Sequence, residues 1–188
     1  EAAIDDAIVI AQVTHDNSLA ISGACAIAAA TSASLAEKAT IEEAISAGVY
    51  GAIRGETKAK SVSRVVAGAS VVERIKLALQ IAEGAGSKEE KLLKLSQIIG
   101  SGLHISEAVP CAFGIAALNK DSALQAVIDA VNIGYDTDTI ATIVGTMVGA
   151  FVDFEDKNFL DLYDKVQKAN EINLIILADE LATAAKVG

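Results

Sequence analysis

The chain has 188 residues, of which 52% are hydrophobic and only 4% are aromatic, and its formal net charge is −10. This length predicts a single domain, 1–188, with a core of Ala, Ile, Leu and Val side chains. The negative charge argues against nucleic acid and membranes as partners. An anionic ligand would need local positive charge from a metal ion or from helix N-termini.

A single proline and the frequent helix formers Ala, Leu, Glu and Lys predict an all-α fold. The expected architecture is a compact multi-helix globular domain around a central apolar helix. The patterns predict helices over residues 2–12, 17–34, 41–51, 58–83, 88–99, 107–118, 121–132, 138–152 and 158–184.

Local signals mark the ends of several of these helices. Thr40–Glu43 and Ser87–Glu90 each place a hydroxyl residue ahead of two acids, which is typical of a helix start. Gly51–Thr57 is predicted to be a solvated turn, and Gly100–Gly102 is a clearer one. Pro110 is expected in the first turn of its helix, where a missing N–H costs least.

The segment from Asn17 to Ala36 contains no charged residue. Its Ala, Ser, Gly and Thr content predicts a central helix packed through small side chains rather than a membrane span. Cys25 and Cys111 lie among small apolar residues without a CxxC partner, so both are expected to be buried and reduced. Together with an N-terminus that lacks a basic signal-peptide start, they predict a cytoplasmic protein.

The most informative motif runs from Gly134 to Thr139 and reads Gly-Tyr-Asp-Thr-Asp-Thr. It stands directly before the uncharged segment 140–150, so two carboxylates and two hydroxyls gather where an apolar helix begins. Such hard oxygen ligands suit Mg²⁺, Mn²⁺ or Ca²⁺. The structural alternative is that Asp136 is an N-cap and Asp138 is a first-turn acid.

Two further polar segments carry the histidines of the chain. In Thr14–Asn17, at a break between two helices, His15 suits a role as ligand, hydrogen-bond donor or acid–base group, and the alternative is a capping turn with a surface histidine. In Gly100–Pro110, the glycines permit close backbone approach and His104 can project toward a ligand. Glu107 is expected to be a first-turn acid.

Taken in this order, the three segments resemble the ADP-ribosylglycohydrolase family, which includes the dinitrogenase-reductase-activating glycohydrolases. The matching residues are Thr14-His15 before an Ala-rich helix, Gly102–Pro110, and Ala130–Thr139 followed by Ile140-Ala141. The last segment is the most specific. The family signature Gly-Gly-Asp-(Ser/Thr)-Asp-Thr-hydrophobic-Ala differs here mainly by Tyr135 in place of the second glycine.

The resemblance implies an all-α fold with a dinuclear Mg²⁺ or Mn²⁺ centre that binds ADP-ribose. It implies hydrolysis of the glycosidic bond of an ADP-ribosylated protein or a small ADP-ribose-containing molecule. Its metal ligands map onto Asp136, Asp138 and Thr139, with Asp138 bridging both ions. Its substrate-binding positions map onto His15, His104, Gly134 and Tyr135.

The resemblance spans the whole chain but only roughly the C-terminal 60% of a typical family member. The family's Thr-Asp-Asp-Thr half-site and catalytic glutamate have no counterpart in the sequence, so the catalytic residues are unknown. A missing N-terminal segment or a partner chain is expected to complete the site. The alternatives are a non-catalytic relative that binds ADP-ribose, a nucleotide or a metal, and a structural protein on the same scaffold.

Overall fold

The computed structural model describes residues 1–187. Within that range it contains ten α-helices and no β-strand, so the all-α prediction is confirmed. The elements are α1 (Ala2–His15), α2 (Ser18–Ser34), α3 (Ile41–Val62), α4 (Val71–Glu83), α5 (Lys88–Lys94), the π-turn η1 (Leu95–Ile99), α6 (Ile105–Leu118), α7 (Ala123–Asn132), α8 (Thr137–Val148), the 3₁₀ turn η2 (Gly149–Phe151), α9 (Lys157–Asn170) and α10 (Leu174–Val187).

The chain divides into two compact units, one from Glu1 to Val152 and one from Asp153 onward. Compactness alone does not decide whether a unit folds independently, so the expectation of one domain stays a prediction. In the second unit, α9 and α10 replace the single helix expected over 158–184. The break comes at Glu171, whose left-handed backbone (φ 54°) ends α9.

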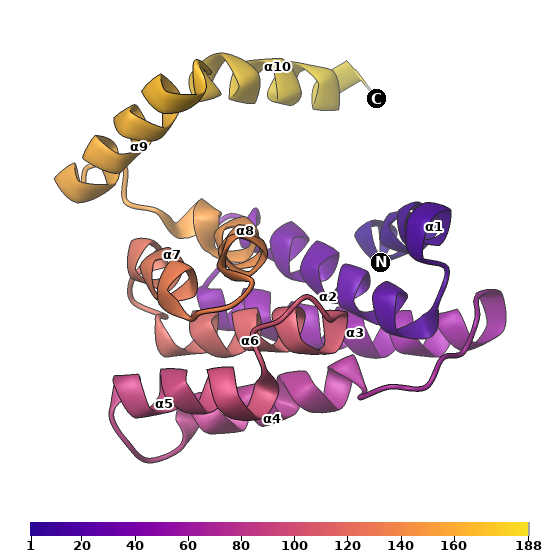
Figure 1. Ribbon diagram of the computed structural model, residues 1–188. Coiled ribbons are helices and arrows are strands. Elements are labelled where there is room, and N and C mark those ends of the chain that lie inside the picture. The colour runs from indigo at the N-terminus through magenta and orange to yellow at the C-terminus, as the bar shows by residue number, and fades with distance from the viewer. Residues whose placement is uncertain (188) are drawn as a thin grey trace. The chain divides into compact units, whose positions relative to one another are not determined.

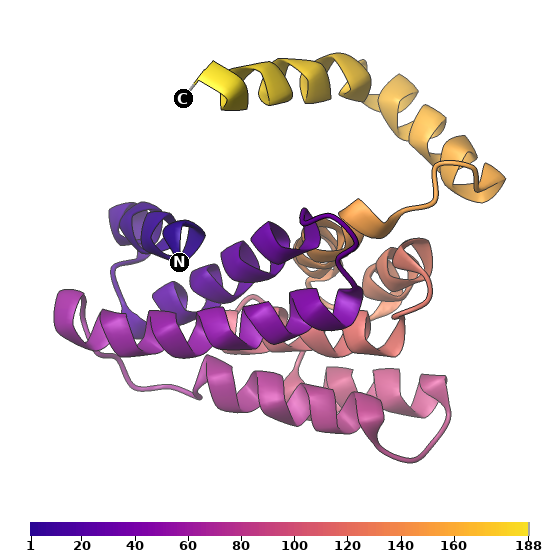
Figure 2. The same cartoon turned by 180° about the vertical axis from the view of Figure 1, so that it is seen from behind.

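In the first unit, α2 is the central apolar helix that the sequence predicts. It contacts α1, α3, α6 and α8, and its residues Ile21, Cys25, Ala26 and Ala30 are buried. Figures 1 and 2 show α3 and α6 between α4–α5 on one side and α2, α7 and α8 on the other. No helix in the described part of the chain is both long enough and apolar enough to cross a bilayer.

The solvated turn predicted at Gly51–Thr57 is wrong, because α3 runs through it without a break. The glycines here serve helix packing. A Cβ added to Gly51 would lie 2.3 Å from the carbonyl oxygen of Cys25, and one added to Gly55 would lie 2.7 Å from the Cys25 Cβ. Gly48 lies on the same face against Phe113. This stripe of glycines lets the α3 backbone approach α2 closely.

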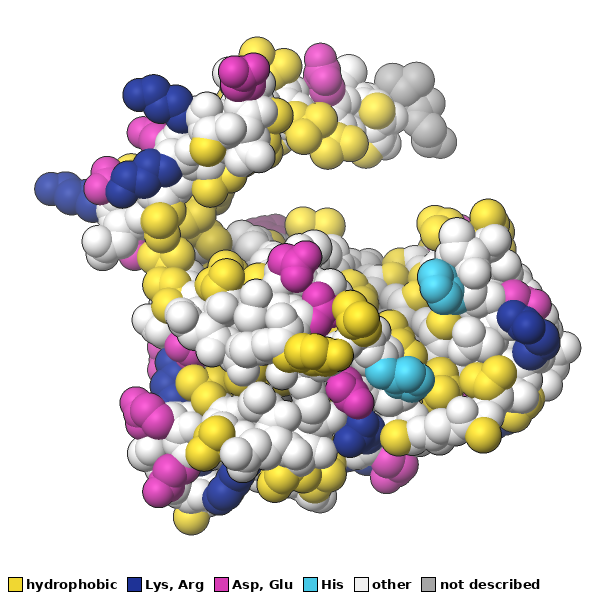
Figure 3. All heavy atoms as spheres, viewed as in Figure 1, with side chains coloured by type: hydrophobic (Ala, Val, Ile, Leu, Met, Phe, Trp, Pro, Cys, Tyr) yellow, Lys and Arg dark blue, Asp and Glu magenta, His cyan; other side chains and the backbone are white. Residues whose placement is uncertain are grey.

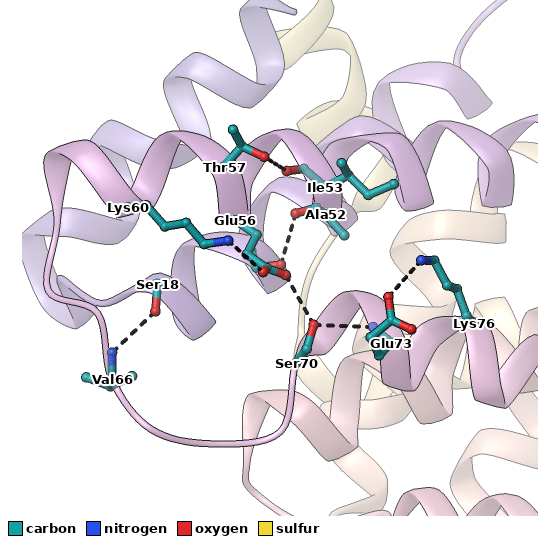
Figure 4. Close-up of polar contacts among 11 residues, drawn as sticks. Ser18, Ala52, Ile53, Glu56, Thr57, Lys60, Val66, Ser70, Glu73 and Lys76 are labelled. Atoms are coloured by element: carbon teal, nitrogen blue, oxygen red, sulfur yellow. Dashed lines mark hydrogen bonds and ion pairs between the residues drawn. The ribbon is translucent and has the colours of Figure 1, made fainter.

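The chain breaks instead at residues 63–70, inside the helix predicted over 58–83. Figure 4 shows how this loop is held: the Ser70 hydroxyl donates to the Glu56 carboxylate of α3 (3.1 Å), and Lys60 pairs with that carboxylate (3.3 Å). Ser70 also accepts the N–H of Glu73 and so begins α4. In the middle of the loop, the Val66 N–H donates to the Ser18 hydroxyl of α2.

Two predicted helix starts are confirmed. Thr40–Glu43 and Ser87–Glu90 each form a capping box. In each box, the hydroxyl of the first residue accepts the N–H of the glutamate, and the glutamate carboxylate accepts the N–H of the first residue. The prediction for Pro110 is wrong, because α6 begins at Ile105 and the proline lies one turn further inside. Pro110 has no N–H to donate to the carbonyl of Ser106, which therefore needs another donor.

A buried polar cluster ties α7 to its neighbours. Asp129 is 8% exposed, and its carboxylate accepts hydrogen bonds from Asn119 (2.9 Å) and Gln125 (2.8 Å) and pairs with Lys88 (2.7 Å). Burial opposes its charge, but the hydrogen bonds from Lys88, Gln125 and Asn119 outweigh burial and lower the pKa of this carboxyl.

Candidate functional site

The acidic motif forms the N-terminal end of α8. Asp136 occupies the N-cap position and Asp138 lies in the first turn, as the structural alternative predicts. The Asp136 carboxylate, however, accepts no hydrogen bond from the helix. Asp136 is half-buried, whereas Asp138 and Thr139 are exposed. The cap position is therefore filled, but its usual side-chain bond is not made.

The backbone just before the acids has an unusual conformation. Gly134 has φ 90° and Tyr135 has φ 62°, and both values lie in the left-handed region that favours glycine. Tyr135 is the residue that stands where the family signature has its second glycine. Its side chain is 82% exposed, so the ring lies at the surface beside the acids.

A second loop, Gly100–His104, lies against the acid motif. The Asp136 N–H donates to the carbonyl of Ser101 (3.0 Å). A Cβ on Gly102 would lie 2.5 Å from the Tyr135 ring, which shows how closely the two loops pack. Glu107 is the predicted first-turn acid of α6. Its carboxylate accepts the N–H of Gly102, which belongs to the Gly100–His104 loop (3.2 Å).

The histidines line one cavity of about 550 Å³. His15 reaches it from the end of α1 and His104 from the start of α6, while the loop before α4 supplies Val66 and Ala67. Figure 3 shows both histidines of the chain on one face, on either side of a hollow. The wall between them is mostly apolar and comes largely from α2: Leu19, Ala20, Ala24 and Ile27.

Each histidine also has a local partner. The Nδ1 atom of His15 lies 3.0 Å from the Thr14 hydroxyl. His104 is the N-cap of α6, and its Nδ1 accepts the Ser106 N–H (3.2 Å). A neutral His104 therefore carries its proton on Nε2, which remains a donor for a ligand. The predicted capping turn is present as well, because Asn17 caps α2 by accepting the Ala20 N–H (2.9 Å).

The cavity lining does not include the acid motif, which joins the cavity only through the Gly100–His104 loop. Among residues 1–187, no group of three or more His, Cys, Asp or Glu side chains is arranged to hold a metal ion. Asp136 and Asp138 nevertheless fit a hard cation in chemistry, because neither carboxylate has a hydrogen-bond or ion-pair partner in this part of the chain. Mg²⁺ is often held by one or two carboxylates, with waters and substrate oxygens completing its shell. The metal assignment stays a prediction.

The cysteines are not candidate nucleophiles. Both are buried and unpaired by disulfides, as predicted. Burial raises the pKa of Cys25 to about 11 and that of Cys111 to about 12. Neither thiol is ionised at neutral pH, and the thiolate is the reactive form.

Sequence reasoning missed the contribution of the loop before α4. Val66 and Ala67 fall inside a predicted helix, yet they form one wall of the cavity. A usable signal was present, because Ser70 followed three residues later by Glu73 is the start pattern of a new helix. No local signal points to Ser101, whose carbonyl joins the two loops.

The model of the family described as ADP-ribosylglycohydrolase matches residues 1–187. A curated relative, "Uncharacterized protein YegU" of Escherichia coli (strain K12), is 31% identical over 147 residues, which are 78% of this chain and 42% of the relative. The chain thus spans less than half the length of that relative. No solved structure matches the chain. Because the family model covers the chain almost from end to end, the protein belongs to the ADP-ribosylglycohydrolase family.

Proposed function

We propose that this chain supplies a cation-binding and ADP-ribose-binding surface of a metal-dependent hydrolase. The reaction is cleavage of the glycosidic bond of an ADP-ribosylated protein or a small ADP-ribose-containing molecule. Asp136, Asp138 and Thr139 would hold Mg²⁺ or Mn²⁺ through oxygen atoms. The observation that carries the proposal is the pair of carboxylates at the start of α8, which have no partner within residues 1–187 and lie on a loop bonded to the cavity loop.

The helix dipole accounts for Asp138 in the first turn, but helix capping does not account for Asp136. A capping aspartate gains its stabilising effect by accepting a backbone N–H, and Asp136 makes no such bond. A divalent cation would give the two carboxylates the partner that each lacks within residues 1–187. The apolar helix behind them, with Ile140 and Val144 buried, fixes their backbone.

The cavity suits the uncharged parts of the ligand. The Nε2–H of His104 and the side chains of His15 and Asn17 offer hydrogen bonds, and the apolar wall of α2 accepts a sugar face or a base. Gly134 and Tyr135 would border the ligand between the cavity and the acids. A bound divalent cation supplies positive charge that holds ribose hydroxyls and polarises water. Such charge is needed locally because the chain carries −10 overall.

Calorimetry with Mn²⁺ tests the cation site. The wild type should bind, and Asp138→Ala should weaken binding by more than about tenfold, since even residues that only support a metal ligand have effects of that size. Asp121→Ala is the matched control, because Asp121 is an exposed acid of the same unit outside both loops. Equal heats for the wild type and Asp138→Ala would refute the metal ligands.

The second experiment follows the ligand in the presence of Mn²⁺. Free ADP-ribose should bind, and release of ADP-ribose from a peptide modified on arginine or serine should be weak or absent with this chain alone. That expectation follows from the lack of a matching catalytic glutamate in the sequence. Rapid hydrolysis would mean that another carboxylate takes that role. Failure to bind ADP-ribose with or without Mn²⁺ would contradict the proposed function.

A further inference from the structure

Arg74 of α4 is half-buried, and no ion pair within residues 1–187 includes it. Its guanidinium donates instead to two backbone carbonyls. Nη1 donates to the carbonyl of Ser106 (3.3 Å) and Nη2 to the carbonyl of Ile98 (3.2 Å). These two carbonyls stand on either side of the Gly100–His104 loop. One side chain therefore joins both ends of that loop.

Both acceptors are carbonyls that lack a normal helical donor. Ile98 lies in the last turn of the helix that runs through α5 and η1, where free carbonyls carry the negative end of the helix dipole. Ser106 lies four residues before Pro110, which has no N–H to donate. A planar guanidinium can serve two such acceptors at once, whereas a lysine ammonium is a point charge without that fixed fork.

The loop between these carbonyls carries much of the candidate site. It places His104 in the cavity, and its Ser101 carbonyl accepts the Asp136 N–H at the start of the acid motif. Two further contacts tie the start of the loop to η1: the Gly100 N–H donates to the carbonyl of Leu95 (3.1 Å), and the hydroxyls of Ser101 and Ser96 lie 3.4 Å apart. The bond from Gly102 N–H to Glu107 holds the other end of the loop to α6. Of these contacts, only those of Arg74 join η1 directly to α6, so Arg74 sets the distance between the two ends of the loop.

We propose that Arg74 is a positioning residue, which sets the Gly100–His104 loop and through it both His104 and the acid motif. Arg74 would act on the ligand only through these groups. The functional meaning of this inference rests on the proposed function, whereas its structural part can be tested alone. The competing explanation is that Arg74 only satisfies the carbonyl exposed by Pro110 and so stabilises α6.

Amide hydrogen exchange tests the structural part. In Arg74→Lys, the Gly102 and Asp136 amides should exchange roughly tenfold faster, because two hydrogen bonds from a charged donor are lost or weakened. Amides in the middle of α2 should keep their wild-type rates. Arg54→Lys is the matched control, since Arg54 is an arginine of α3 that faces Glu1 instead of the loop. Unchanged rates at Gly102 and Asp136 would overturn the proposal.

Pro110→Ala separates positioning from simple satisfaction of a carbonyl. It restores a backbone N–H that can donate to Ser106, so it supplies what Arg74 gives to α6 but nothing to Ile98. In the double variant with Arg74→Lys, the loop amides should still exchange faster than in Pro110→Ala alone. If the loop amides exchange at the same rates in the double variant and in Pro110→Ala, Arg74 serves only the helix and the proposal is wrong.

Binding of Mn²⁺ then tests the functional part. Arg74→Lys should weaken Mn²⁺ binding several-fold and shift the imidazole NMR signal of His104 but not that of His15, and these are the two histidines of the chain. Wild-type affinity together with faster loop exchange would overturn positioning of the acids. If the wild type itself binds no Mn²⁺, the proposed function fails, and the exchange rates still decide whether Arg74 sets the loop.

Discussion

Replacing Gly51 by alanine tests the close contact between α2 and α3. At an open helical position, this change favours the helix by about 1 kcal/mol. Here the new Cβ would lie 2.3 Å from the carbonyl oxygen of Cys25 and 2.5 Å from the Ala29 Cβ. Since a carbon–oxygen contact normally lies near 3.3 Å, the two helices must move apart by about 1 Å.

The cost of that movement exceeds the gain in helix propensity. The colliding oxygen belongs to the backbone of α2 and cannot rotate away, so the cost should lie at the upper end for an overpacked core, about 3 kcal/mol. A gap of this size also weakens the other contacts along the interface. We therefore expect Gly51→Ala to lower the free energy of unfolding by about 2 kcal/mol net.

Thermal denaturation followed by circular dichroism measures this loss. For a chain of this size, the midpoint should fall by about 4–8 °C. Gly145→Ala is the matched control, because the nearest atom to its added Cβ is a Val127 methyl at 3.9 Å. That variant should gain the helix propensity and melt about 2–4 °C higher. If Gly51→Ala is as stable as the wild type, the glycine stripe is not required by packing.

Two further predictions concern charge and backbone strain. Because the pKa of Asp129 is lowered in the folded state, its stabilising effect is complete above the unfolded value of about 3.9 and is lost as the pH falls through the folded pKa. In urea titrations, Asp129→Asn should therefore lower the free energy of unfolding by about 2 kcal/mol at neutral pH and by progressively less below about pH 4. The control Asp121→Asn should change this free energy little at either pH. A loss for Asp129→Asn that is the same at both pH values would contradict the pH dependence. Tyr135→Gly should raise the free energy of unfolding by up to about 1 kcal/mol, because glycine adopts φ 62° without strain. Tyr135→Ala should give no such gain. Equal effects of the two substitutions would exclude the release of backbone strain as the cause.

Local sequence rules located the helices whose starts carry their own signals. Thr40–Glu43 and Ser87–Glu90 form capping boxes because the interacting groups lie within four residues of each other. The same rules failed at Gly51 and Gly55. These positions require glycine because α2, the preceding helix, packs against them, and a short stretch of sequence around Gly51 does not include the α2 residues that it contacts.

The candidate site was predictable in its parts but not in its assembly. His15 and His104 were identified from polar segments between helices, and the structure brings them to one cavity. The wall from Val66 and Ala67 was missed because the helix predicted over 58–83 hid the loop. The bond from Asp136 to Ser101 joins residues more than thirty positions apart, and only the packing of α6 and α8 brings them together.

The backbone hydrogen bond between Ser101 and Asp136 couples the order of the Gly100–His104 loop to that of the acid motif. A ligand that orders one loop leaves less disorder for the other to lose, so a second ligand binds at a smaller entropic cost. For the proposed ligands, reciprocity then requires that the cation and ADP-ribose raise each other's affinity by the same factor. The free concentration of divalent metal around the protein would thereby set how tightly it holds the proposed ADP-ribose ligand.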